Sequence, residues 1–277
     1  METGDTDTTI KDSNATRYWA GVGFRVREGV KMHQITGQLE KGPDSWKNVT
    51  EHCLVQVARS EVLGRLLGLP EDLVGDMRIG AMLHDFDKKQ EINVTREANR
   101  RGDSPLLSVS AEHIRAQVLL ERHGFSERVI RLANASGVDV SQLVEAQRIL
   151  DQESLSDEDL ARLLGHYVDD CSIGTDWVAH SQQGRNIVDN RMEQNKLKLD
   201  YAKISQEIGQ QLSSHPKLGG MNIYDAAVFV DRQIEQRFAA RIKEKTGEDI
   251  DPLTIPELVD QKIRESIENT KASNNRT

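Results

Sequence analysis

The chain has 277 residues, enough for one large or two small domains with a sizeable core. Its composition, 37% hydrophobic, 29% charged and only 4% aromatic, is typical of a soluble, helical protein. The formal net charge of −9 argues against sequence-independent binding of long nucleic acids, which depends on Lys and Arg contacts to phosphates. A small phosphorylated substrate is compatible with this charge, because a metal ion and a few basic side chains can bind it.

We expect no targeting signal in the N-terminal residues. Residues 1–15 are polar and rich in Thr and Asp, so we expect a disordered tail. A secretory signal would need a basic and then an apolar region, and no apolar run approaches the ~18 residues that span a bilayer. The two cysteines, Cys53 and Cys171, lie in apolar helical patterns and are predicted to be buried free thiols. We therefore expect a cytoplasmic protein without membrane contacts.

Residues 16–44 are predicted to form an N-terminal extension. Apolar and polar residues alternate over 24–27 and again over 31–35, and Glu28-Gly29 lies between the two runs. Alternation with a period of two is typical of strands, and Gly favours a turn, so this stretch predicts a short β-hairpin.

Helical signals begin near residue 45, and we expect residues 45–213 to form one helical domain. Apolar residues recur at three- and four-residue steps before Gly68 and Pro70, which end the first helix. Residues 92–108 are polar and are predicted to be a loop over the site. Further helical patterns cover residues 110–123, 126–136, 141–150 and 157–170.

The last of these helices has a well-marked start, because Ser156 and Asp159 form a capping-box pattern. Residues 214–271 are predicted to be a C-terminal helical extension with two amphipathic segments, and residues 272–277 a disordered tail. The two segments can pack on the bundle or on a partner chain, so a homo-oligomer is one arrangement they allow. The predicted fold class is all-α.

Four residues are candidate metal ligands. An apolar run ends in adjacent His84 and Asp85, and His52 and Asp169 lie in two other helical patterns. Imidazole nitrogen suits Mn, Fe, Co, Ni or Zn, and carboxylate oxygen suits Mg or Mn. Two His and two Asp would place two negative charges around a doubly charged ion. Taken singly, His52 is also typical of a packed core residue, and Asp169 and Asp170 of a helix end in solvent.

The order His52, His84-Asp85, Asp169 resembles the HD-domain superfamily of metal-dependent phosphohydrolases, over roughly residues 45–180. The resemblance implies a helical bundle that holds one divalent ion (Mn, Fe, Co, Ni, Mg or Zn) with these four residues. It favours Asp169 over Asp170, because the family's last ligand follows a small or apolar residue. Residues 133–136 lack the His with which some members bind a second ion, so we expect one ion.

Asp85, Lys88 and His113 are the candidate catalytic residues. Lys88 matches the lysine of the family's His-Asp-x-x-Lys variant, which implies contact with the substrate phosphate. His113 can donate a proton or bind phosphate, because its unperturbed pKa is ~6.5. An ordinary solvated Lys and a surface His are the alternatives. Asp87 stands where many members have Gly, so we expect a different turn here.

Arg185 and Arg191 are candidate substrate-binding residues in a mixed-charge stretch, 185–203. Similar helices follow the last metal-binding Asp in some HD proteins and approach a nucleotide phosphate. A solvated helix face is the alternative reading of such a stretch.

The resemblance implies hydrolysis of a small phosphorylated substrate, most simply a nucleotide monoester or diester, by metal-activated water. A second interpretation is a non-catalytic module that keeps the site for folding, regulation or nucleotide sensing. A third, an RNA or cyclic-dinucleotide phosphodiesterase, would need an electropositive groove, which the net charge does not favour. The scaffold cannot choose the substrate, because HD proteins act on several classes of molecule.

Overall fold

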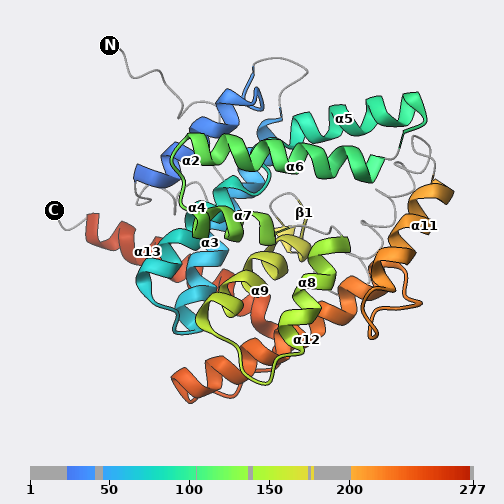
Figure 1. Ribbon diagram of the computed structural model, residues 1–277. Coiled ribbons are helices and arrows are strands. Elements are labelled where there is room, and N and C mark those ends of the chain that lie inside the picture. Colours follow the sequence, from blue (N-terminus) through green and yellow to red (C-terminus); the bar gives the residue numbers. More distant parts are fainter. Residues whose placement is uncertain are drawn as a thin grey trace, which may run out of the picture.

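A computed structural model describes residues 24–40, 46–103, 105–136, 140–173, 176–177 and 201–274 (Figure 1). This part of the chain is helical, which confirms the predicted all-α class. A ribbon of two two-residue strands, which was not predicted, pairs Ser172 with Trp177 and Ile173 with Asp176 in antiparallel register. The elements are α2 (Phe24–Ile35), α3 (Lys47–Leu66), α4 (Glu71–Leu83), α5 (Lys88–Arg101), α6 (Pro105–Arg122), α7 (Glu127–Ala135), α8 (Val140–Leu150), α9 (Asp157–Asp170), β1 (Ser172–Ile173), β2 (Asp176–Trp177), α11 (Tyr201–Leu212), α12 (Ile223–Thr246), the 3-10 helix η2 (Pro252–Thr254) and α13 (Ile255–Asn274).

Helix α3 lies at the centre of the bundle. Every residue from Cys53 to Gly64 is buried, including the charged Arg59 and Glu61. A helix that is covered all round must have neighbours on several sides, and α3 packs against α4, α9, α12 and α13. Helix α4 in turn contacts α2, α7 and α9. The first half of α3, the end of α4 and the end of α9 are thereby held together.

Two hydrophobic clusters form the core. The larger joins α3, α4 and α7–α9 to the C-terminal helices, with Leu63, Tyr167 and Phe238 among its fully buried residues. The smaller joins α2 and the first half of α3 to the end of α4 and to α6 and α7, and Met82 is one of its fully buried residues. Helices α12 and α13 belong to the same core as α3, α8 and α9. Figure 1 shows α12 along the lower side of the bundle and α13 at the left, near the C-terminal end.

The predicted hairpin is wrong where the structure describes it, because residues 24–35 form helix α2. Gly29, which was taken as a turn residue, lies inside this helix against α4. A Cβ at this position would be 2.8 Å from Met82 Cγ, so the missing side chain allows a close helix crossing. Val30 and His33 are buried three residues apart on α2, which is helical rather than strand spacing.

The loop predicted at 92–108 is also wrong. Helix α5 covers residues 88–101 and α6 begins at Pro105, so most of this polar stretch is helical. The two helices run side by side at the top of Figure 1. Ala98 is buried in α5, whose other positions are mainly polar because much of its surface faces solvent. Mutual packing of α5 and α6 supplies the burial that the sequence pattern did not reveal.

Helix boundaries follow local signals in two places and depart from them in one. Ser156 caps α9: its Oγ accepts from the Asp159 amide at 3.1 Å, and its own amide donates to Asp159 Oδ2 at 3.0 Å. Gly68, at a φ of +67°, follows α3 in the left-handed region that favours glycine. The tail predicted from residue 272 is wrong at its start, because α13 continues to Asn274, with neither Gly nor Pro to end it. The predicted tail at 1–15 lies outside the described residues.

Candidate metal centre

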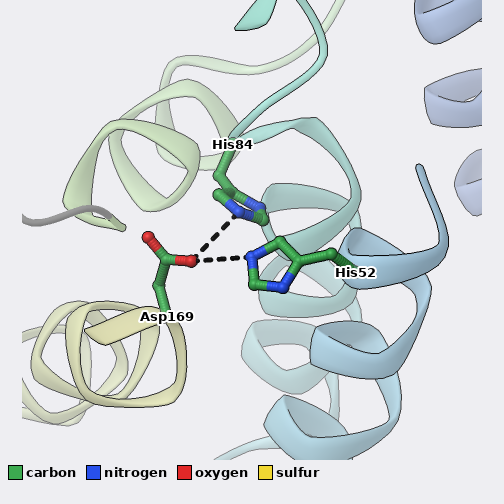
Figure 2. A group of neighbouring side chains, drawn as sticks. All are labelled: His52, His84 and Asp169. Carbon is green, nitrogen blue, oxygen red and sulfur yellow. Dashed lines mark hydrogen bonds and ion pairs between the residues drawn. The ribbon is translucent and has the colours of Figure 1, made fainter. Parts of the chain in front are cut away.

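Three of the four predicted ligands converge at one point (Figure 2). His52 projects from the first half of α3, His84 directly follows α4, and Asp169 is the second-last residue of α9. One ligand atom from each lies within 4.8 Å of the other two. The side chains of His52 and Asp169 are only 11% and 13% exposed, and that of His84 only 1%. The packing of α3, α4 and α9 thus places two imidazoles opposite one carboxylate.

Both imidazoles direct Nε2 at the same carboxylate oxygen. Asp169 Oδ1 lies 2.9 Å from His52 Nε2 and 3.3 Å from His84 Nε2, as the dashed lines in Figure 2 mark. The two rings meet edge to face, with centroids 5.3 Å apart. Ligand atoms with bonds of about 2.0–2.2 Å to one ion lie roughly 3–3.5 Å apart, so these two separations already suit a shared ion.

The hydrogen bonding of His84 makes Nε2 the ring atom that could bind a metal ion. Nδ1 lies 2.8 Å from the Ala81 carbonyl oxygen, and a carbonyl can only accept, so Nδ1 carries a proton. In the neutral ring, Nε2 therefore carries the lone pair. This atom is buried and has no regular hydrogen-bond partner in the described part of the chain; it faces the carboxylates of Asp169 and Asp85. An imidazole oriented by a backbone carbonyl, with its other nitrogen aimed at carboxylates, fits a metal ion.

The buried carboxylates of the site also favour a positive charge between them. Burial lowers the pKa of His84, but Cys53, Asp169 and Asp85 together raise it well above its ordinary value. Burial raises the pKa of Asp169, but His84 and His52 lower it far below its ordinary value. Without a metal, a proton on His84 balances the carboxylates. A divalent ion would take over that role and displace the proton, so its binding should weaken as the pH falls.

Gln56 belongs to this site and was missed by the sequence analysis. It lies one turn after His52 on α3, and its amide nitrogen donates to Asp169 Oδ1 at 2.5 Å and lies 2.6 Å from His52 Nε2. The spacing of four residues, which places two helical side chains on one face, was the available signal. A buried Gln beside His52 can hold the Asp169 carboxylate in place.

Asp85 and Lys88 lie at the edge of the three-residue group. Asp85 Oδ2 is 3.7 Å from His84 Nε2, and Asp85 Oδ1 is 3.5 Å from Lys88 Nζ. Asp85 itself does not complete the close group, so it would have to rotate toward an ion. Asp85 and the neighbouring Glu91 raise the pKa of Lys88, despite its burial. Lys88 is therefore charged and close to the proposed ligands.

His113 reaches the site through Glu91, a residue that the sequence analysis also missed. Glu91 Oε1 lies 3.2 Å from Lys88 Nζ, and Glu91 Oε2 lies 3.7 Å from His113 Nε2. Burial raises the pKa of Glu91, but the hydrogen bond to His113 and the charge of Lys88 outweigh burial and bring that pKa below its ordinary value, so the carboxylate is ionised. The side chain of His113 is 42% exposed, and it lies beside Glu91, outside the group formed by His52, His84 and Asp169.

A buried network supports the turn that carries His84 and Asp85. His33 Nε2 donates to the Met82 carbonyl at 2.7 Å, and Thr50 Oγ1 donates to His33 Nδ1 at 3.1 Å. The amide of Gln38 donates to the Asp85 carbonyl at 2.6 Å. The amide nitrogen of Gln38, which can only donate, also lies 3.3 Å from His33 Nδ1. Nδ1 therefore accepts while Nε2 donates, so His33 is neutral and both ring nitrogens are satisfied. This histidine is a structural support for the turn.

The remaining predicted site residues lie elsewhere in the structure or outside its described part. Asp170, the alternative last ligand, lies apart from His52 and His84, in a group with His166 and Asp231. Arg185 and Arg191 lie outside the described residues, so their predicted contact with substrate stays a prediction.

Comparison with known proteins finds no matching family model, no similar curated protein and no similar solved structure. Among the described residues, no helix has the length and apolar content needed to cross a bilayer.

Proposed function

We propose that this protein is an HD-type, metal-dependent phosphohydrolase that acts on a small phosphorylated substrate, most simply a nucleotide. The observation that carries the proposal is the convergence of His52, His84 and Asp169 from three helices, with Asp85 beside them. Their order along the chain is the order of the HD motif. A divalent ion held here would polarise a phosphoryl oxygen and lower the pKa of a water nucleophile.

The residues beside the ligands fit this chemistry. Lys88, charged and next to Asp85, can contact a phosphate oxygen and balance its charge. His113 and Glu91 form a pair from which a proton can be supplied near that phosphate. Gln56 donates to the Asp169 carboxylate and would fix its orientation when an ion is bound.

The test combines metal content with turnover. Protein stripped with a chelator and reloaded with Mn²⁺ is assayed for phosphate release from mono-, di- and triphosphate nucleotides, and for ring opening of cyclic nucleotides. Asp85→Ala should lose both retained metal and hydrolysis, because it removes a negatively charged ligand. If this variant keeps full activity, the assignment is wrong.

Lys88 and Lys89 offer a matched pair of variants. Lys89 pairs instead with Glu40, at 2.6 Å, away from the ligands. Lys88→Gln should lower kcat/KM by about 10- to 100-fold, since a charge-assisted hydrogen bond contributes about 1.5–3 kcal/mol. Lys89→Gln should leave kcat/KM close to that of the unaltered protein. Equal losses in the two variants would remove Lys88 from the proposed site.

A non-catalytic, ligand-sensing module is the second candidate, and one observation favours it. Lys88 is held by Asp85 and Glu91, and Asp87 and Glu112 are buried nearby. These acids would repel a phosphate before an ion is bound. Burial, followed by the charges of Glu91 and Glu112, raises the pKa of Asp87 to about 7. Tight nucleotide binding without turnover, under the Mn²⁺ conditions above, would select this module over the hydrolase.

A further inference from the structure

A second group of metal-ligating side chains lies between α9 and α12. His166 and Asp170 are one turn apart on α9, and Asp231 faces them from α12, which packs against α9. One ligand atom from each lies within 4.8 Å of the other two. This group shares no residue with the site formed by His52, His84 and Asp169.

The second group combines burial with excess negative charge. His166 and Asp231 are only 1% and 3% exposed, and Asp170 is half-buried. The negative charge of the neighbouring Glu235 is compensated, because its carboxylate accepts hydrogen bonds from Tyr167 Oη at 3.1 Å and from Arg232 Nη1 at 3.3 Å. Asp170 and Asp231 therefore place two carboxylates side by side, and Arg232 is already paired with Glu235.

The Asp231 carboxylate has an oxygen suited to a ligand. Its Oδ1 is buried and accepts no hydrogen bond from the part of the chain that the structure describes. Its Oδ2 is approached by a weak donor, the Cys171 thiol, at 3.9 Å. Buried carboxylate oxygens are normally paired with donors or cations, because desolvation of the charge is otherwise uncompensated. Either a cation or a shared proton is needed here.

We propose that His166, Asp170 and Asp231 form a second, independent site for a divalent transition-metal ion. One imidazole nitrogen and two carboxylate oxygens suit Mn²⁺, Fe²⁺ or Zn²⁺. A dication would neutralise the two carboxylates, and bonds of about 2.0–2.2 Å would need only small side-chain rotations. The family resemblance predicts one ion, held by His52, His84, Asp85 and Asp169, and this site would add another from residues outside that set.

Two members of the second group border solvent or a cavity. Asp170 is partly exposed, and His166 borders a cavity of about 210 Å³ between α7, α8 and α9. The cavity is lined by Gln142 of α8 and Arg162 of α9, among other residues. Arg162 is paired with Glu145 at 3.0 Å, which offsets its repulsion of a cation.

The rival explanation is a proton shared between Asp170 and Asp231. Burial, followed by the charge of Asp170, raises the pKa of Asp231 well above its ordinary value, as such a pair requires. Metal stoichiometry distinguishes the two explanations, because a shared proton binds no ion. The full chain is stripped with a chelator and dialysed to equilibrium against Mn²⁺ or Zn²⁺, and the bound ion per chain is measured by elemental analysis.

We expect two ions per unaltered chain, one in His84→Gln, one in Asp231→Asn and none in the double variant. Glu244→Gln, an exposed charge change on the same helix α12, should still bind two. His166→Gln should also lose one ion, which covers the case in which Asp231→Asn does not fold by circular dichroism.

The proposal is overturned if Asp231→Asn and His166→Gln fold and bind as many ions as the unaltered chain. That result leaves the His52 site unaffected. Conversely, a chain that loses its ion in Asp231→Asn but not in His84→Gln supports the second site and contradicts the proposed function.

Discussion

Two glycines of α4 provide a sharp test of how the bundle is packed, because one faces a neighbouring helix and the other does not. A Cβ at Gly80 would lie 2.9 Å from Leu132 Cβ and 3.1 Å from the Ala133 backbone nitrogen, both on α7. A Cβ at Gly75 would meet nothing within 4 Å. Backbone cannot rotate away as a long side chain can, so Gly80→Ala must push α4 and α7 apart.

The two substitutions share one energy term and differ in the other. Ala in place of Gly inside a helix stabilises by about 0.5–1 kcal/mol in both variants. Overpacking at Gly80 should cost about 1–3 kcal/mol, and Gly75→Ala should carry no such cost. The free energy of unfolding of Gly80→Ala should therefore be lower than that of Gly75→Ala by about 1–3 kcal/mol.

Urea unfolding followed by circular dichroism measures this difference, and thermal unfolding checks it. For a chain of this size, 1 kcal/mol corresponds to a shift in Tm of about 2–4 °C. Gly75→Ala should unfold at or above the unaltered protein, and Gly80→Ala below Gly75→Ala. If the two variants are equally stable, the close α4–α7 crossing described here is wrong. Because Gly80 is one turn before His84, Gly80→Ala should also weaken metal binding more than Gly75→Ala.

Burial lowers the pKa of His33 to about 4, against about 6.5 in an unfolded chain, so the unfolded state binds the proton first as the pH falls. Neutral His33 should therefore contribute up to about 3 kcal/mol to the free energy of unfolding above pH 6.5, and this contribution should be lost between about pH 6.5 and 4. In His33→Gln the free energy of unfolding should depend less on pH over that range. An unchanged pH dependence would contradict the burial of a neutral His33. Tyr167→Phe removes the buried hydrogen bond to Glu235 and should lower the free energy of unfolding by about 1–3 kcal/mol. Urea unfolding identical to that of the unaltered protein would contradict a stabilising role for this hydrogen bond. Burial raises the pKa of both Cys53 and Cys171, so a thiol reagent should label them only after denaturation, and rapid labelling of the native chain would refute their burial.

Several features could be predicted because short segments determine them. The capping box at Ser156 depends on residues three positions apart, and the end of α3 depends on the preference of Gly68 for a positive φ. The two cysteines follow apolar helical spacing and are buried. The imidazole and carboxylate groups of the proposed ligands could also be read from the sequence, because the chemistry of a side chain does not depend on the fold.

Other features needed contacts between distant segments. Alternation over residues 24–35 favoured strands, but the close approach of Gly29 to Met82 on α4 stabilises a helix there. The polar stretch in α5 was not predicted to be helical, because its burial comes from packing against α6 and not from a pattern in its own residues. Gln56 and Glu91 have ordinary surroundings along the chain and acquire their roles only when α9 and α6 lie beside them.

The residue types at His52, His84, Asp85 and Asp169 were evident from the sequence alone, and so was their order. Their meeting was not, since His52 and Asp169 are 117 positions apart and no local pattern measures that separation in space. Burial of α3 against α4 and α9 brings the two imidazoles to one carboxylate. The same packing turns the adjacent Asp170 toward α12, because neighbouring residues of a helix point about 100° apart.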